Sequence, residues 1–249
     1  MFMPLRHGFD EYFGLSLSVD MWPGHPDLIT NLPALLAARK REYPNLPIWD
    51  GDKKFREGKG TNWEGGTREP CIMRWPGHIP AGADTWDMLM TIDLFPTIAK
   101  LVGAKLPGHK IDGLDVWPII SRQPGAKNPH ESYWFYYEVN QLQAVTTGDG
   151  RWKLQLPHTF QTLAGKPGGT NGVPAPYSHR MIEDEELYDL VHDIAETTNV
   201  AQQHPEMVKR LEAEVEKARA DLGDALTKRP GSGQREPGRI SQGGTKTGK

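Results

Sequence analysis

The chain has 249 residues, enough for one or two domains with a substantial core. Charged residues make up 24% of it and the formal net charge is −3, which excludes a global basic field of the kind that binds nucleic acid. One cysteine excludes an intrachain disulfide, and no apolar run approaches the ~20 residues that span a bilayer. The first residues, MFMPLRHGFDEYFG, contain no long apolar stretch, so we expect no signal peptide here.

The first part of the chain predicts loops with one helix and one strand. Residues 4–27 are rich in glycine, proline and aromatic residues, and residues 27–43 have helical character weakened by Pro33. Residues 68–77, REPCIMRWPG, contain a short apolar run and predict a buried strand. Because a lone cysteine is usually an inert core residue, we expect Cys71 to be buried in that strand.

A helix is expected over residues 93–103, DLFPTIAKLVG. Asp93 stands at the N-cap position, Pro96 lies in the first turn and Gly103 follows the end.

The second half of the chain predicts antiparallel strands followed by a long helix. Residues 133–139 and 142–156 have strand character, and the GDG sequence within the latter predicts a hairpin turn. Residues 185–200 pass from a strand to a turn. Residues 205–223 predict a helix that begins with Pro205. Its apolar stripe, which we expect to cover the strands, consists of Val208, Leu211, Val215, Ala218 and Leu222.

A glycine-rich loop, GKGTNWEGG, spans residues 58–66. Gly58 and Gly60 let the backbone bend around Lys59, so the loop can present one cation. On spacing alone an exposed surface lysine is the commoner interpretation. Glu64 and Arg68 could pair with each other and brace the loop, a structural role that we favour over catalysis.

Longer motifs carry a family resemblance. The string GKGTNWEGGTREPCIMRWPGHIPAG resembles the sulfate-binding segment of arylsulfatase A-type sulfatases. The strings TIDLFPTIAKLVGAKLP, YYEVNQLQAVTTGDGRWKLQLPH and ELYDLVHDIAETTNV follow in that family's order and spacing. HGFDEYFGLSLSVDMWPGHP resembles a stretch near the middle of a full sulfatase, so the resemblance covers most of residues 4–222.

The resemblance implies a mixed α/β fold, a partial sandwich of the alkaline-phosphatase type with a smaller C-terminal antiparallel sheet plus helix. The domains expected are residues 1–125, the remnant of the large sulfatase α/β domain; residues 126–228, the sheet-plus-helix subdomain; and residues 229–249, a disordered tail. Because the large domain lacks core strands of the family, we expect poor solubility or partial disorder in about the first 125 residues.

The chain also departs from the family's pattern. These sulfatases use a formylglycine made in a C/S-x-P-x-R motif, and no cysteine or serine of this chain lies in one, so formylglycine is not encoded here. Calcium is implied by the resemblance, but the family's calcium ligands are absent. An internal deletion near residue 52 removes a segment that carries the histidine contacting the sulfate ester.

Two residues are candidates for the site. The resemblance makes Lys59 the sulfate-contacting lysine, catalytic and substrate-binding, because charge develops on the sulfuryl and leaving oxygens. His158, at the end of the strand LQL beside the insertion AGKPGGTNG, is a candidate substrate-binding residue. A loop histidine bonded to backbone is an equal alternative for His158. Asp184, Glu185 and Glu186 could suggest a metal cluster, but a solvated acidic turn is the better interpretation.

Two classes of function stay open. The first is a sulfuric ester hydrolase acting on aryl or carbohydrate sulfates, with this chain inactive alone because the nucleophile is missing. The second is a non-catalytic fragment or pseudoenzyme that acts at most as an anion-binding module; a related phosphoester hydrolase is weaker. The expected partner is a sulfate ester, with no nucleic acid and no membrane. The resemblance implies a periplasmic, secreted or lysosomal location.

Overall fold

A computed structural model describes residues 13–15, 48–50, 53–58, 60–165 and 176–235. Its strands are β1 (Phe13–Leu15), β2 (Ile48–Asp50), β3 (Lys53–Lys54), β4 (Ser132–Tyr137), β5 (Gln141–Thr147), β6 (Trp152–Gln155), β7 (His158–Thr162), β8 (Ser178–Ile182) and β9 (Glu186–Asp189). Its helices are α3 (Glu64–Thr67), the 3₁₀ helix η3 (Thr91–Asp93), α4 (Leu94–Leu101), α5 (Trp117–Ile120) and α6 (Pro205–Leu222).

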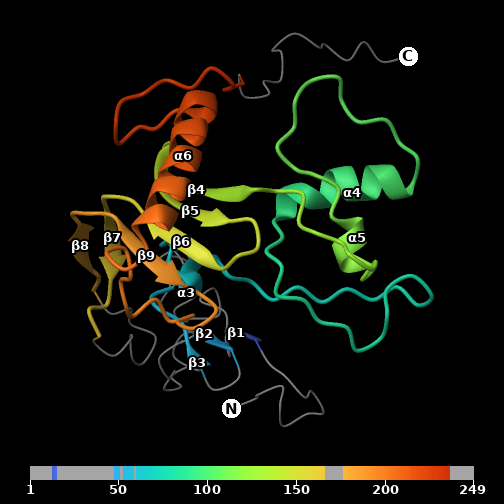
Figure 1. The fold of residues 1–249 in the computed structure, drawn as a ribbon, viewed down its shortest axis with the longest axis horizontal. Coiled ribbons are helices and arrows are strands. Elements are labelled where there is room, and N and C mark those ends of the chain that lie inside the picture. The colour runs from blue at the N-terminus through green and yellow to red at the C-terminus, as the bar shows by residue number, and fades with distance from the viewer. Residues whose placement is uncertain (1–12, 16–47, 51–52, 59, 166–175, 236–249) are drawn as a thin grey trace, which may run out of the picture.

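The centre of the described structure is a four-stranded antiparallel sheet. Its strand order is β4-β5-β6-β9, and β5 and β6 form the hairpin that the GDG sequence predicts, with Gly150 at φ 70°. Helix α6 lies across one face of this sheet, while α4 and α5 lie to one side of the sheet and helix (Figure 1). The expected antiparallel sheet plus helix is therefore confirmed.

Helix α6 is held by its apolar stripe. Leu211, Val215 and Ala218 are buried against the sheet, where they meet Leu142 and Leu154 of β5 and β6. Pro205 stands in the first turn, as expected, and Gly223 ends the helix. Burying such a stripe removes apolar surface from water, and this is the main force that fixes the helix on the sheet.

The sheet is covered on its other face too. Every residue of β6 is buried, and because side chains alternate along a strand, Trp152 and Leu154 face α6 while Lys153 and Gln155 face the segment 55–67. That segment brings Phe55 and Trp63 into a second apolar cluster with Phe160, Ile182, Tyr188, Leu190 and Ile194. The glycine loop is thus packed onto the sheet.

The hairpin of β7 and β8 differs from the sequence-based expectation. Its five-residue register runs from His158 opposite Ile182 to Thr162 opposite Ser178. His158 therefore begins a new strand and does not end the preceding one, because the chain turns at Leu156 and Pro157 between β6 and β7.

The predicted strand over residues 68–77 is wrong. The chain there is neither helix nor strand, the Ile72 side chain is 87% exposed and Cys71 is exposed. An apolar run becomes a buried strand only where another element covers it, and among the described residues none covers this one.

The expected helix over residues 93–103 is confirmed as α4, with one difference at its start. The Asp93 carboxylate does not cap the helix; it accepts hydrogen bonds from the Met90 and Leu114 backbone amides at 3.1 and 3.0 Å. Gly103 follows the helix with φ 67°, as its position predicts.

Two other predictions concern the ends of the chain. The helix expected over residues 27–43 lies outside the described residues, as does the tail beyond residue 235. The first part of the expected disordered tail does have contacts: Arg229 pairs with Asp224 in a β-bridge, and the Ser232 amide donates to the Ala220 carbonyl at 2.9 Å.

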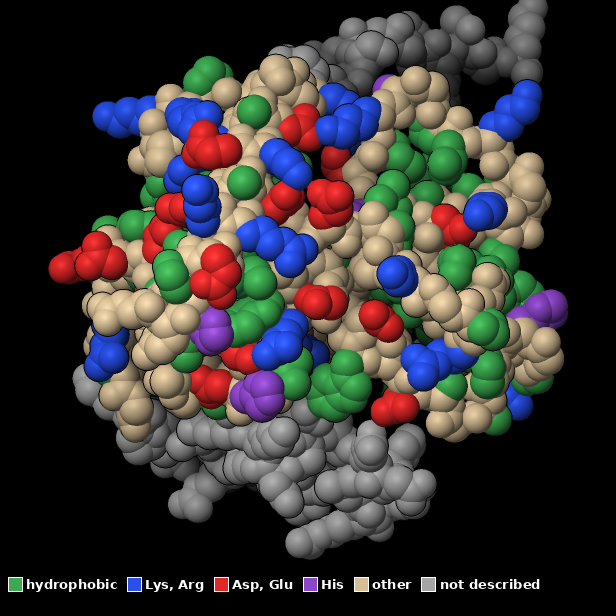
Figure 2. Space-filling view, in the orientation of Figure 1, with side chains coloured by type: hydrophobic (Ala, Val, Ile, Leu, Met, Phe, Trp, Pro, Cys, Tyr) green, Lys and Arg blue, Asp and Glu red, His purple; other side chains and the backbone are tan. Residues whose placement is uncertain are grey.

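The surface around α6 carries interspersed charges of both signs (Figure 2). They pair locally: Glu216 contacts Arg219 at 3.0 Å and Arg229 at 2.6 Å, and Lys217 contacts Glu214 at 2.5 Å. Exposed pairs like these stabilise a fold by at most about 1 kcal/mol each. Within the described ranges, no helix has the length and apolar character needed to cross a bilayer.

Candidate functional site

The glycine loop has a shape that its glycines make possible. A Cβ on Gly65 would lie 2.4 Å from the Arg56 carbonyl oxygen, and one on Gly66 would lie 2.2 Å from that of Thr61. Gly60 has φ 95°, a conformation that favours glycine. The described part of the loop, from Gly60 to Gly66, is therefore tightly folded. Lys59 itself lies outside the described residues, so its role stays a prediction.

Hydrogen bonds hold this loop to the sheet. The Asn62 side-chain amide donates to Gln143 Oε1 at 2.8 Å, and the Gln155 amide donates to the Asn62 carbonyl at 3.3 Å. Before the loop, Thr162 donates to Glu57 Oε1 at 2.6 Å. Because these partners lie in β5 and β6 of the four-stranded sheet and in β7 of the two-stranded sheet, both sheets position the loop.

A buried ionic cluster adds a stronger connection. Lys153 of β6 is fully buried, and its Nζ lies 2.9 Å from Glu64 Oε1 and 3.1 Å from Glu196 Oε1. The Glu64 backbone amide donates to Glu196 Oε2 at 2.6 Å. Arg68 Nε lies 2.6 Å from Glu64 Oε2, which confirms the expected pairing of these two residues. The cluster thus brings the carboxyl groups of Glu64 and Glu196 together with the cationic side chains of Lys153 and Arg68.

The two carboxyl groups titrate differently because their neighbours differ. Burial acts to raise the pKa of Glu64, but the charges of Lys153 and Arg68 outweigh it and hold that pKa below its ordinary value. Burial raises the pKa of Glu196 to about 7, since Lys153 offsets only part of it and the Glu64 charge adds to it. Burial acts to lower the pKa of Lys153, but Glu196 and Glu64 raise it, so the ammonium stays charged.

Arg56 contacts the same cluster through Trp63, Tyr188 and the Glu196 backbone. Its guanidinium lies 3.5 Å from the centroid of the Trp63 ring, in a cation–π contact. Its NH1 donates to the Glu196 carbonyl at 2.8 Å and to the Tyr188 hydroxyl at 3.2 Å. Trp63 in turn meets Phe160 and Tyr188 edge to face at 5.3 and 5.6 Å. Arg56, just before the glycine loop, and Glu64, within it, therefore both contact Glu196.

The structure places His158 inside the protein. The ring is 1% exposed and its Nδ1–H donates to the Leu156 carbonyl at 2.7 Å. Burial lowers the pKa of His158, so the imidazole is neutral at physiological pH. The hydrogen bond to the Leu156 carbonyl is the kind expected if His158 is bonded to the backbone. A contact with substrate would require the covering residues to move, and that role stays a prediction.

Acidic and histidine side chains do not gather at one point in the described residues. These residues contain no group of three or more His, Cys, Asp or Glu side chains arranged to hold a metal ion. In the acidic run 184–186, Glu186 accepts a hydrogen bond from the Tyr188 hydroxyl at 2.6 Å and Asp184 is exposed.

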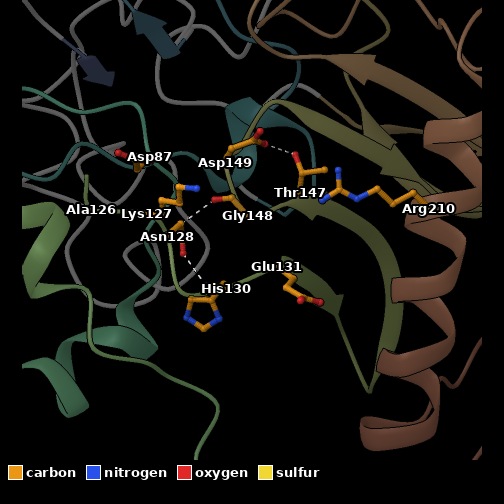
Figure 3. Close-up of a pocket in the computed structure, with 10 residues that line it drawn as sticks. All are labelled: Asp87, Ala126, Lys127, Asn128, His130, Glu131, Thr147, Gly148, Asp149 and Arg210. Carbon is orange, nitrogen blue, oxygen red and sulfur yellow. Dashed lines mark hydrogen bonds between the residues drawn. The ribbon is translucent and has the colours of Figure 1, made fainter. Parts of the chain in front are cut away.

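A surface hollow of about 300 Å³ lies elsewhere, between the β5–β6 turn, the segment before β4 and the side of α6 (Figure 3). Several of its polar groups are engaged in hydrogen bonds with neighbouring loop residues. Asn128 donates to the Gly148 and Met88 carbonyls at 2.7 and 2.6 Å, and Thr147 donates to Asp149 at 2.5 Å. These contacts hold loops together, so we do not assign the function to this hollow.

Comparisons with known proteins match the part of the sequence that contains the glycine loop. Residues 55–155 match the family model described as N-sulphoglucosamine sulphohydrolase, C-terminal, and residues 128–232 match the C-terminal region of aryl-sulfatase. This part of the chain is an arylsulfatase-type sulfatase C-terminal region. The glycine loop lies within the first match and Glu196 within the second, while Lys153 lies in both.

Individual relatives extend the comparison. Mouse (Mus musculus) steryl-sulfatase is 35% identical over 186 residues, covering 69% of this chain and 29% of the relative. Human (Homo sapiens) arylsulfatase A is 36% identical over 184 residues, covering 70% and 34%. A solved sulfatase from Pseudoalteromonas sp. superposes with a TM-score of 0.53 at 22% identity, covering 72% and 36%, and supports the fold. The chain thus spans about a third of the length of these relatives.

From the sequence we did not predict that Lys153 and Glu196 are buried beside the glycine loop. The signal available was the alternation in WKLQL, where Lys153 and Gln155 occupy one face of a strand. A polar face normally indicates solvent. Here it is buried because the glycine loop covers it, and only the tertiary contacts reveal that.

Proposed function

We propose that this chain supplies the anion-contacting loop of a sulfuric ester hydrolase, with Lys59 as the cation that contacts the sulfate group. The observation that carries the proposal is the glycine loop. It flanks Lys59, lies in the region matched by sulfatase models, and is fixed to the sheet by buried polar contacts. An ammonium carried by a loop whose neighbouring residues are fixed would stabilise negative charge on sulfuryl oxygens with little reorganisation during the reaction.

Carbohydrate or aryl sulfates are the proposed substrates. The first family model is described by a sulfated glucosamine, and the second by aryl-sulfatase. We further propose residues 126–228 as the sheet-plus-helix subdomain that supports the loop. An exported or lysosomal location is part of the same proposal.

We propose that the 249-residue chain alone binds a sulfate ester without turning it over. No C/S-x-P-x-R motif occurs in the sequence, so the nucleophile of the family is not encoded in these residues. The family resemblance implies calcium as a cofactor. No step proposed for this chain depends on that ion.

The test is hydrolysis and binding of a chromogenic aryl sulfate by the purified chain, with calcium added, beside Lys59→Ala. We expect no turnover in either protein, and binding that Lys59→Ala weakens at least tenfold. Equal binding by both proteins would refute the role of Lys59. Turnover that Lys59→Ala abolishes would refute the proposal that the chain binds without reacting.

A further inference from the structure

Lys153 joins two segments that are far apart in the sequence. Its ammonium lies 2.9 Å from a carboxylate oxygen of Glu64, in the glycine loop, and 3.1 Å from one of Glu196, in the turn after β9. The other oxygen of Glu196 accepts the Glu64 backbone amide at 2.6 Å. Glu196 thus contacts the loop twice, once directly and once through Lys153.

A buried cluster of this kind is not explained by stability alone. Apolar residues of similar volume usually stabilise a core as well as a buried ion pair does, because the charges lose their hydration. An apolar core would cover the sheet equally well, but it would not fix the direction of the Glu64 amide. The directional contacts therefore specify one orientation of the loop.

We propose that Lys153 and Glu196 are positioning residues for the glycine loop, which they hold through Glu64 in the orientation that binds the sulfate group. This inference rests on the proposed function, in which the loop contacts the anion. Neither residue touches the ligand in this account. Their effect on binding passes through the position and the charge of the loop.

The charge of Glu196 should make anion binding by the loop depend on pH. Glu196 faces Lys153 from β6 and Glu64 from α3. Arg56 NH1 donates to the Glu196 backbone carbonyl and also to the Tyr188 hydroxyl. Burial raises the pKa of Glu196 to about 7, so this carboxyl ionises near neutral pH. Its ionisation adds one negative charge beneath the loop and weakens the binding of an anion there.

The experiment is isothermal titration calorimetry of inorganic sulfate into the full 249-residue chain at pH 5.5 and pH 8. Wild type is compared with Glu196→Gln, which keeps an oxygen for the Glu64 amide but cannot ionise. The matched control is Glu214→Gln, which removes another lysine-paired glutamate, 2.5 Å from Lys217 on the surface of α6. Lys59→Ala is included to test the proposed function separately.

We expect the Kd of wild type for sulfate to rise about threefold between pH 5.5 and pH 8, the effect of one partly screened charge. The Kd of Glu196→Gln should stay constant within a factor of about 1.5, and Glu214→Gln should follow wild type. A Glu196→Gln profile as steep as that of wild type would overturn the inference. Binding that Lys59→Ala leaves unchanged would instead overturn the proposed function.

A second measurement does not depend on sulfate binding. Glu196→Leu removes the acceptor of the Glu64 amide, so hydrogen exchange at the Glu64, Gly65 and Gly66 amides should speed up at least tenfold. Exchange in β4 and β5 should stay as in wild type. Unchanged protection of the three loop amides would overturn the positioning role, and so would an equal loss of protection throughout the sheet, since that indicates a general structural defect.

Discussion

Removing the ammonium at the centre of the buried cluster should destabilise the protein in a pH-dependent way. In Lys153→Met the Glu64 and Glu196 carboxyls lose the cation that lies 2.9 and 3.1 Å away, and both remain inside the protein. A buried pair broken on one side typically costs about 3–5 kcal/mol of unfolding free energy. We expect a loss of that size at pH 7.5.

The expected loss is smaller in acid. A carboxyl that has lost its cation can become neutral, and holding it neutral costs about 1.4 kcal/mol for each pH unit above its ordinary pKa. For Glu64, whose pKa lies below its ordinary 4.5 in wild type, neutrality costs about 4 kcal/mol at pH 7.5 and about 1 kcal/mol at pH 5. Glu196 adds less than about 1 kcal/mol to this difference, because its pKa is already about 7 in wild type. Lys153→Met should therefore lose only about 1–2 kcal/mol at pH 5.

The assay is urea denaturation followed by tryptophan fluorescence at the two pH values. The double variant Lys153→Met/Glu196→Gln is the control, because it leaves the Glu64–Arg68 pair and one neutral amide in the cluster. It should recover to within about 2 kcal/mol of wild type at pH 7.5. An equal loss at both pH values in the single variant would refute the reasoning, since a packing defect does not depend on pH.

Three further predictions concern the loop, the core and the pH optimum. Gly66→Ala should cost about 2–4 kcal/mol and weaken sulfate binding, because its Cβ would lie 2.2 Å from a backbone oxygen of the same loop; Gly58→Ala, with nothing within 4 Å, should cost under about 1 kcal/mol in the same urea titration. Leu211→Ala should cost about 2–5 kcal/mol, measured by thermal unfolding, because this side chain is fully buried between α6 and the sheet; a loss under about 1 kcal/mol would contradict that packing. The contribution of Glu196 to stability, present below about pH 4.5, should disappear as pH rises through about 7, and that of Glu64 should disappear as pH falls below 4.5. Melting temperatures across the pH range should therefore peak near pH 5 in wild type and shift towards neutral pH in Glu196→Gln.

Local patterns in the sequence predict a large part of the described fold. The apolar stripe of α6, the GDG turn between β5 and β6 and the helix signals around α4 each lie within one element. The pairing of Glu64 with Arg68 is also local, because Glu64 begins α3 and Arg68, four residues later, is its C-cap. Such features depend on residues that are neighbours in the chain, so their periodicity and spacing are visible without a structure.

The sequence by itself therefore determined the long helix, the antiparallel hairpin and, through its motifs, the sulfatase resemblance and the glycine loop. The tertiary structure decided which faces are covered. It buries Lys153 between Glu64 and Glu196, 89 and 43 residues distant in the chain, and leaves the apolar run around Cys71 exposed. It also places His158 inside the protein, bonded to backbone. The physical reason is that burial depends on what packs against a residue, and those contacts join segments that no local pattern connects.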